Sequence, residues 1–260
     1  MPEQYRSFRA EAVVLRHQDW LEADRLLWLF TRQVGKVRAV AKGARRVRSR
    51  KAGHLEPFTH VNLLLARGRD LLLVTQAETQ DAHLALREDL TRLGYASYVV
   101  ELLDRFTAEE DENEPLYHVL TDTLSRLETA TDLLLPTRYF ELRLLDLTGY
   151  RPQLFQCVVC ESEIQPVHQY FSAAQGGVLC PQCGLRAPEA RPISLPALKY
   201  LRHLQRSTYT EAARAHIPPN IHREMEALMQ YYLTYLLERS PNAVEFLKIV
   251  KKKPGSENIG

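Results

Sequence analysis

The chain has 260 residues, of which 45% are hydrophobic and 25% are charged, and its formal net charge is only +2. A chain of this length and composition can bury real cores, and we expect two domains or three small ones. No apolar run approaches the ~18 residues needed to cross a bilayer, and Met1 leads into a polar stretch, so we expect a soluble, cytoplasmic protein without a membrane partner.

The small net charge hides a strong segregation along the chain. Residues 1–80 contain 15 Lys and Arg against 8 Asp and Glu, residues 81–150 contain 6 against 15, and residues 151–260 contain 13 against 9. The chain therefore looks like three modules of different charge.

The first module has the pattern of short strands. We predict strands at residues 9–15, 24–31, 37–41, 61–66 and 71–75. Five strands in about eighty residues suit a small closed barrel, of which the OB-fold is the commonest nucleic-acid-binding form. Trp28 and Phe30 share one face of an apolar strand, where core packing is the favoured interpretation.

A basic segment separates the third and fourth predicted strands. From Arg25 through Leu55 there are ten basic residues and no acidic one. Long cationic side chains along a loop can follow a phosphate backbone without reading sequence, whereas the alternative is a merely solvated basic loop. The residues that we predict to contact nucleic acid are Lys36, Arg38, Lys42, Arg45, Arg46, Arg48, Arg50 and Lys51.

The remaining chain is mainly helical in pattern. We predict helices at residues 93–106, 116–127, 137–147, 195–205 and 220–237. The acidic cluster at residues 109–114 lacks the ligand periodicity of a calcium loop and is interpreted as a solvated connection between helices. The lysine-containing tail at residues 251–260 is expected to be disordered, either adding affinity for nucleic acid or solubilising the chain.

All four cysteines of the chain lie in two CxxC pairs, Cys157 with Cys160 and Cys180 with Cys183. This ligand set and spacing predict one structural, tetrahedral zinc ion, with two disulfides as the alternative. Because sulfur would fill all four positions, no open position remains to activate a water molecule.

Motifs of catalysis are missing from the sequence, which has no GxSxG, Walker A, HExxH or Gly-rich dinucleotide loop. We therefore expect neither an enzyme nor a small-molecule substrate. The rival classes are a zinc-ribbon transcription or RNA-binding factor and a nucleic-acid-processing enzyme, and the latter would need a paired carboxylate or His/Glu site that the sequence does not offer.

In order and spacing, a series of segments resembles the RecO recombination mediators of bacteria. The segments are Glu22–Leu26, Leu29–Thr31, Gly35–Lys36, Ala41–Arg46, Ser49–Arg50, Leu55–Phe58, Phe140–Leu145, Gly149–Pro152, Phe171–Ser172 and Gly176–Cys180. The sequence departs from the family pattern at Glu161, where the family often has glycine after the first CxxC pair.

The resemblance implies an α+β multi-domain chain with an N-terminal OB-fold, a helical domain and an inserted zinc ribbon. We place these domains at residues 1–80, 81–150 and 151–190, followed by C-terminal helices at 191–250 that pack on the helical domain. The resemblance also implies a non-enzymatic, nucleoid-associated protein that binds single- and double-stranded DNA and anneals complementary strands. Its implied partners are RecR, single-strand DNA-binding protein (SSB) and, functionally, RecA, which it helps to load onto SSB-coated DNA.

Overall fold

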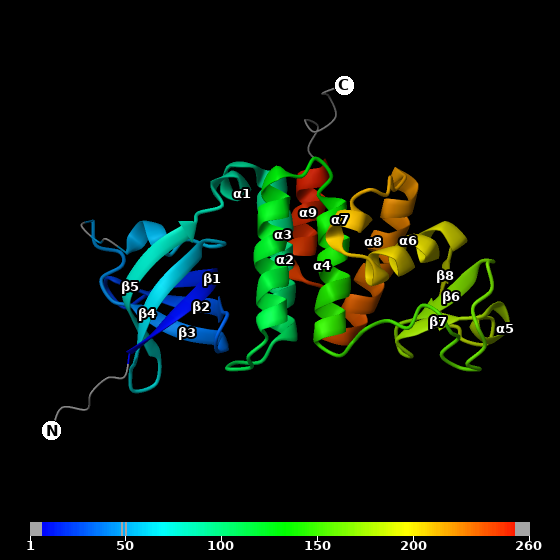
Figure 1. Ribbon diagram of the computed structural model, residues 1–260, viewed down its shortest axis with the longest axis horizontal. Coiled ribbons are helices and arrows are strands. Elements are labelled where there is room, and N and C mark those ends of the chain that lie inside the picture. Colours follow the sequence, from blue (N-terminus) through cyan, green and yellow to red (C-terminus); the bar gives the residue numbers. More distant parts are fainter. Residues whose placement is uncertain (1–6, 48, 50, 253–260) are drawn as a thin grey trace. The chain divides into compact units, whose positions relative to one another are not determined.

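A computed structural model describes residues 7–47, 49 and 51–252. The chain divides into two compact units, residues 1–129 with 246–260 and residues 130–245 (Figure 1). This division differs from the predicted domains, because the predicted helical domain at 81–150 is shared between the two units.

The first unit begins with five strands that close into a barrel. They are β1 (Ser7–Trp20), β2 (Asp24–Thr31), β3 (Gly35–Ala41), β4 (His60–Arg67) and β5 (Leu72–Asp81). The order around the barrel is β1–β2–β3–β5–β4, in which β3 and β5 are parallel and all other neighbours are antiparallel. This five-stranded closure is the arrangement expected of an OB-fold.

Alternation along β2 decides which side chains fill the barrel. Leu27 and Leu29 are fully buried in the barrel core, so the intervening even-numbered residues point to its outer surface. Phe30 is nevertheless fully buried, with its ring centroid 6.3 Å from that of Tyr117. Trp28 is only partly buried. The prediction of core packing is therefore confirmed for Phe30 and wrong for Trp28, which lies on the outer face.

Helices complete the first unit. They are η1 (Ala52–His54), α1 (Leu84–Glu88), α2 (Leu90–Phe106), α3 (Glu114–Thr129) and the part of α9 (Asn242–Lys252) from residue 246 onward. Gly94 of α2 lets α9 approach closely, because a Cβ atom there would lie 2.7 Å from Leu247 Cδ2. The prediction of a disordered tail was wrong for Lys251 and Lys252, which the amphipathic α9 includes, and residues 253–260 lie outside the described part of the chain.

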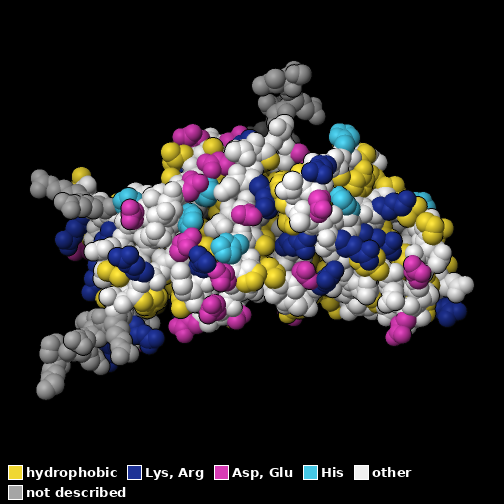
Figure 2. Space-filling view, in the orientation of Figure 1, with side chains coloured by type: hydrophobic (Ala, Val, Ile, Leu, Met, Phe, Trp, Pro, Cys, Tyr) yellow, Lys and Arg dark blue, Asp and Glu magenta, His cyan; other side chains and the backbone are white. Residues whose placement is uncertain are grey.

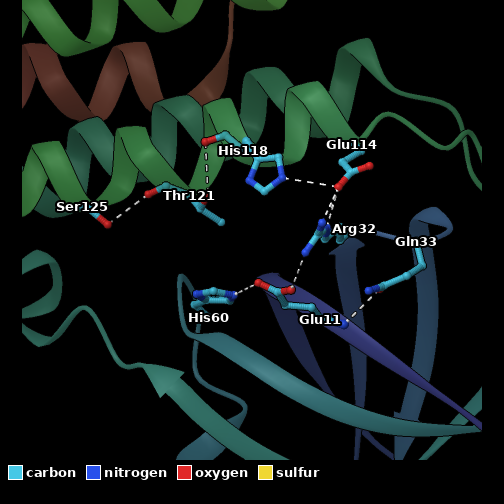
Figure 3. Close-up of polar contacts among 8 residues, drawn as sticks. All are labelled: Glu11, Arg32, Gln33, His60, Glu114, His118, Thr121 and Ser125. Atoms are coloured by element: carbon cyan, nitrogen blue, oxygen red, sulfur yellow. Dashed lines mark hydrogen bonds and ion pairs between the residues drawn. The ribbon is translucent and has the colours of Figure 1, made fainter. Parts of the chain in front are cut away.

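Charged side chains connect the barrel to the helices of the same unit. Arg32, in the turn after β2, lies 3.5 Å from a carboxylate oxygen of Glu11 and 2.6 Å from one of Glu114, at the start of α3 (Figure 3). The hydrogen bond from Arg32 lowers the pKa of Glu114. His60 adds a 2.9 Å contact to Glu11. The acidic second block of the sequence thus neutralises part of the basic first block.

The second unit combines a small sheet with a group of helices. Its elements are α4 (Leu134–Leu147), β6 (Gln169–Ser172), β7 (Gly177–Leu179), α5 (Pro181–Gly184), β8 (Arg191–Ile193), α6 (Leu195–Arg206), α7 (Tyr209–Ala212) and α8 (Pro219–Leu237). The sheet has the order β7–β6–β8, and α4 packs against α6 and α8.

In neither unit does any helix of the described residues have the length and apolar character to span a membrane.

Candidate nucleic-acid interface and metal centre

The basic loop between β3 and β4 is anchored to the barrel at both ends. Ala44 and Leu55 are fully buried members of the barrel core. The backbone N–H of Gly43 donates to Asp24 Oδ1 at 2.8 Å, and that of Arg45 donates to the carbonyl oxygen of Ala23 at 3.0 Å. The loop is therefore held beside the turn between β1 and β2.

Three of the predicted contact residues lie exposed on this loop. Lys42, Arg45 and Arg46 are all exposed, and the neighbouring Val47 projects fully into solvent. Arg45 has one carboxylate partner, Asp19 at 3.2 Å, in an open environment. Arg48 and Arg50 lie outside the described residues. The loop thus brings several cations together on the outside of the barrel.

Two other predicted contact residues are engaged within the unit. Lys36 is only 8% exposed, and its Nζ donates to the carbonyl oxygen of Asp104 at 2.5 Å and to Asp104 Oδ1 at 3.0 Å. Lys51 Nζ donates to the carbonyl oxygen of Val74 at 3.2 Å, and burial lowers the pKa of this lysine. We correct the predicted interface by leaving out Lys36, because a buried ammonium group paired with a carboxylate does not reach a phosphate.

Arg38, on the outer face of β3, is half exposed and paired with Glu109 at 2.8 Å. Its register partner on β2 is Trp28, whose own partner on β1 is Arg16. Sequence reasoning missed Arg16 and Trp28 as surface residues. The period-two alternation of β2 around the buried Leu27 and Leu29 is the signal that could have found them.

Basic side chains outnumber acidic ones in the barrel region of the first unit, and acidic ones outnumber basic ones in its helices α1 to α3. Figure 2 shows dark blue Lys and Arg side chains over the barrel, while magenta Asp and Glu side chains gather over the neighbouring helices. Exposed cations at the barrel can attract a polyanion, and their segregation from the acidic helices directs it to one side of the unit.

The four cysteines of the second unit come together next to the end of β7 in the small sheet. Cys157 and Cys160 lie in a turn before β6, and Cys180 and Cys183 lie at the start of α5. All four are free thiols, and one sulfur atom from each lies within 4.8 Å of the others. The prediction that the two CxxC pairs converge is confirmed.

The donor set fits zinc better than disulfides. The Sγ atoms of Cys160 and Cys180 are 3.8 Å apart. Sulfur atoms bound to one tetrahedral zinc at ~2.3 Å are separated by ~3.8 Å, whereas a disulfide needs ~2.05 Å. A hydrogen bond with Ser162 lowers the pKa of Cys160 to about 6, and one with Cys180 raises the pKa of Cys183 to about 12. The first thiolate to form in the cluster opposes ionisation of the remaining thiols, and a bound cation would relieve this repulsion.

Glu161 closes the first cysteine turn in a conformation that favours glycine. Its φ is +60°, and its N–H donates to the carbonyl oxygen of Cys157 at 2.8 Å. We expect Glu161→Gly to raise the free energy of unfolding by about 1 kcal/mol or less, because relief of the left-handed strain exceeds the added chain entropy. Thermal denaturation measures the change. Glu163→Gly, two residues away, should destabilise, and an unchanged or lowered stability of the Glu161 variant would contradict the strain argument.

Comparison with known proteins covers nearly the whole chain. Residues 5–83 match the family model "Recombination protein O N terminal", and residues 87–244 match "Recombination protein O C terminal". A protein named "DNA repair protein RecO" from Roseiflexus sp. (strain RS-1) is 42% identical over 247 residues, which cover 95% of this chain and 87% of that protein.

Other relatives have the same name. The protein of Desulforudis audaxviator (strain MP104C) is 40% identical over 94% of this chain and 97% of its own length. That of Dehalococcoides mccartyi (strain ATCC BAA-2266 / KCTC 15142 / 195) is 35% identical over 92% of this chain and 94% of its own length. Together with the two family models, which match consecutive parts of the sequence, these relatives show that the chain belongs to the RecO family of DNA repair proteins.

Proposed function

We propose that this protein is a non-enzymatic DNA-binding mediator of recombinational repair. It binds single- and double-stranded DNA, anneals complementary strands and, with RecR, helps to load RecA onto DNA coated by SSB. Membership of the RecO family supports the repair role, and the RecO resemblance is the source of the named partners.

The anchored basic loop is the observation that carries the proposal. Lys42, Arg45 and Arg46 are exposed on a segment whose two ends are fixed in the barrel core. Contacts from such cations to phosphates release counterions and do not depend on base sequence. A protein that pairs any two complementary strands needs affinity of this sequence-independent kind.

The cysteine centre has a structural part in this proposal. Cys157, Cys160, Cys180 and Cys183 would hold one Zn²⁺, which fixes the turn before β6 to the start of α5. Four thiolate ligands leave the metal no open position for a substrate or a water molecule. We therefore assign the ion to folding and the function to binding alone.

Annealing of complementary oligonucleotides, followed with and without SSB, tests the proposal. We expect the protein to accelerate annealing of bare strands and to retain activity on SSB-coated strands, while non-complementary strands of the same length give no duplex. Unaccelerated annealing, or a preference for RNA over DNA of the same sequence, would instead favour an RNA-binding or transcription factor.

A further inference from the structure

A row of three side chains crosses the outer face of the barrel. Arg16 of β1 pairs in register with Trp28 of β2, and Trp28 pairs in register with Arg38 of β3. The guanidinium carbon of Arg16 lies 3.3 Å above the centre of the Trp28 ring. A guanidinium plane stacked on indole forms a flat, cationic surface with an aromatic base.

This row is accessible to a ligand. The side chains of Arg16 and Arg38 are 50% and 45% exposed, and Trp28 is only partly buried. Phe30, two residues further along the same face of β2, is completely buried against Tyr117. The helices therefore bury one end of this face, whereas the Arg16–Trp28–Arg38 row stays partly exposed.

The row continues into the basic loop. Arg38 precedes Ala41, the last residue of β3, by three positions, which corresponds to about 10 Å along a strand. The exposed loop cations begin directly afterwards at Lys42. One nucleic-acid strand that lies on the loop can therefore reach the row without leaving the barrel surface.

Each arginine of the row is paired with a carboxylate. Glu109 contacts Arg38 twice, at 2.8 Å to Nε and 3.2 Å to a terminal nitrogen. Asp104 lies 3.7 Å from Arg16 Nε. These carboxylate oxygens present to the guanidinium groups the same acceptor chemistry as phosphate oxygens.

The segment that carries Glu109 is docked on β3 by its backbone. The N–H of Glu110 donates to the carbonyl oxygen of Lys36 at 2.8 Å. At Gly35, a Cβ atom would lie 2.0 Å from the carbonyl oxygen of Asp111, so only glycine permits this approach. Glu109 is thus held in place against the barrel, and its side chain competes with any anion for Arg38.

We infer that the Arg16–Trp28–Arg38 row is a stacking site for unpaired nucleobases, at which a backbone phosphate replaces the carboxylate of Glu109 on Arg38. Unstacked bases pack on aromatic rings and on guanidinium planes, whereas the bases of a duplex are hidden within their own stack. The row therefore discriminates single strands from duplex. This inference rests on the proposed binding of DNA by the barrel and its loop.

Replacement of Trp28 tests the stacking. We expect Trp28→Ala to weaken binding of a fluorescent thymidine oligonucleotide about fivefold or more, as base stacking predicts, and to leave affinity for a duplex within about twofold. Trp28→Phe should retain most of the single-strand affinity, and Arg16→Ala, which also removes a positive charge, should weaken binding of single strands more than binding of duplex. Trp20→Phe, at the exposed end of β1, is the matched control and should bind like the parent.

Intrinsic fluorescence gives a readout that does not require loss of Trp28. The chain has two tryptophans, so Trp28 is the only one in the Trp20→Phe variant. A base stacked on the Arg16–Trp28 pair should change its emission when the single strand is added, and duplex should leave it unchanged. Equal emission with and without the single strand would overturn the inference.

Replacement of Glu109 tests the competition. Glu109→Gln should raise DNA affinity about two- to fivefold, the range expected for release of one exposed ion pair, and this gain should vanish when Arg38→Ala is added. Glu112→Gln removes one charge from the same segment and should give a smaller gain that persists in the Arg38→Ala background. An equal gain for the two glutamate variants would show a general charge effect and contradict exchange at Arg38.

The outcomes separate this inference from the proposed function. If Trp28→Ala is folded and binds single strands like the parent, while loss of the loop arginines abolishes binding, the row is not a stacking site but the DNA-binding function stands. If the loop variant also binds like the parent, the proposed function itself fails.

Discussion

Cys157→Ser is expected to abolish zinc binding and to unfold the small sheet of the second unit. Cys157 is 1% exposed and supplies one of the four converging sulfur atoms. Structural zinc sites contribute about 10–16 kcal/mol of apparent binding free energy, comparable with the entire stability of about 5–15 kcal/mol of a typical domain. Metal analysis should find one zinc ion per parent chain and none in the variant, and thermal denaturation should show a lower midpoint or loss of the transition.

Ser162→Ala is the matched control for this prediction. It removes the hydroxyl group 3.1 Å from Cys160 Sγ but leaves all four sulfur ligands in place. This variant should keep its zinc and most of its stability. A parent protein that contains no zinc after purification without chelator, or that contains a disulfide between any of the four cysteines, would show that the centre is not a zinc site.

The positions of most barrel strands and of the longer helices could be predicted because they depend on local sequence patterns. The strand predicted at residues 24–31 coincides with β2, because apolar and turn residues there mark both ends. The predicted strand ended at Leu15 and missed the end of β1, because the residues from Arg16 to Trp20 are polar or exposed, and only pairing with β2 makes them a strand. Helices α5 and α7 have four residues each, too few to show a helical period.

The candidate sites divide in the same way. The cysteine centre could be predicted because its ligands are defined by two short motifs, whose convergence needs only a hairpin between them. Which basic residues are free to contact a ligand could not be predicted, because the partners of Lys36 and Arg38 are 68 and 71 residues distant in sequence. A count of charges shows that acids exist elsewhere in the chain, but the fold decides which cations they neutralise.

Simultaneous replacement of Arg45 and Arg46 with alanine is expected to weaken DNA binding on the order of a hundredfold at about 50 mM salt, if each arginine contacts one phosphate. The slope of log K against log salt should become shallower by about 1.8 for duplex and about 1.4 for single strands. The loss should be equal for unrelated sequences, because phosphate contacts contain no sequence information. Fluorescence anisotropy across a salt series measures all three quantities.

The same variant should remain folded, since both arginines are exposed and the ion pair of Arg45 with Asp19 lies in solvent, where such pairs contribute about 0–1 kcal/mol. Arg186→Ala with Arg223→Ala removes the same charge from exposed positions of the second unit and should leave the salt slope unchanged. Adding Arg48→Ala and Arg50→Ala should extend the change in slope to about 3.6 for duplex and about 2.8 for single strands. Parental binding and annealing by the four-arginine variant, or loss of binding explained by an unfolded barrel, would show that the loop is not the contact surface.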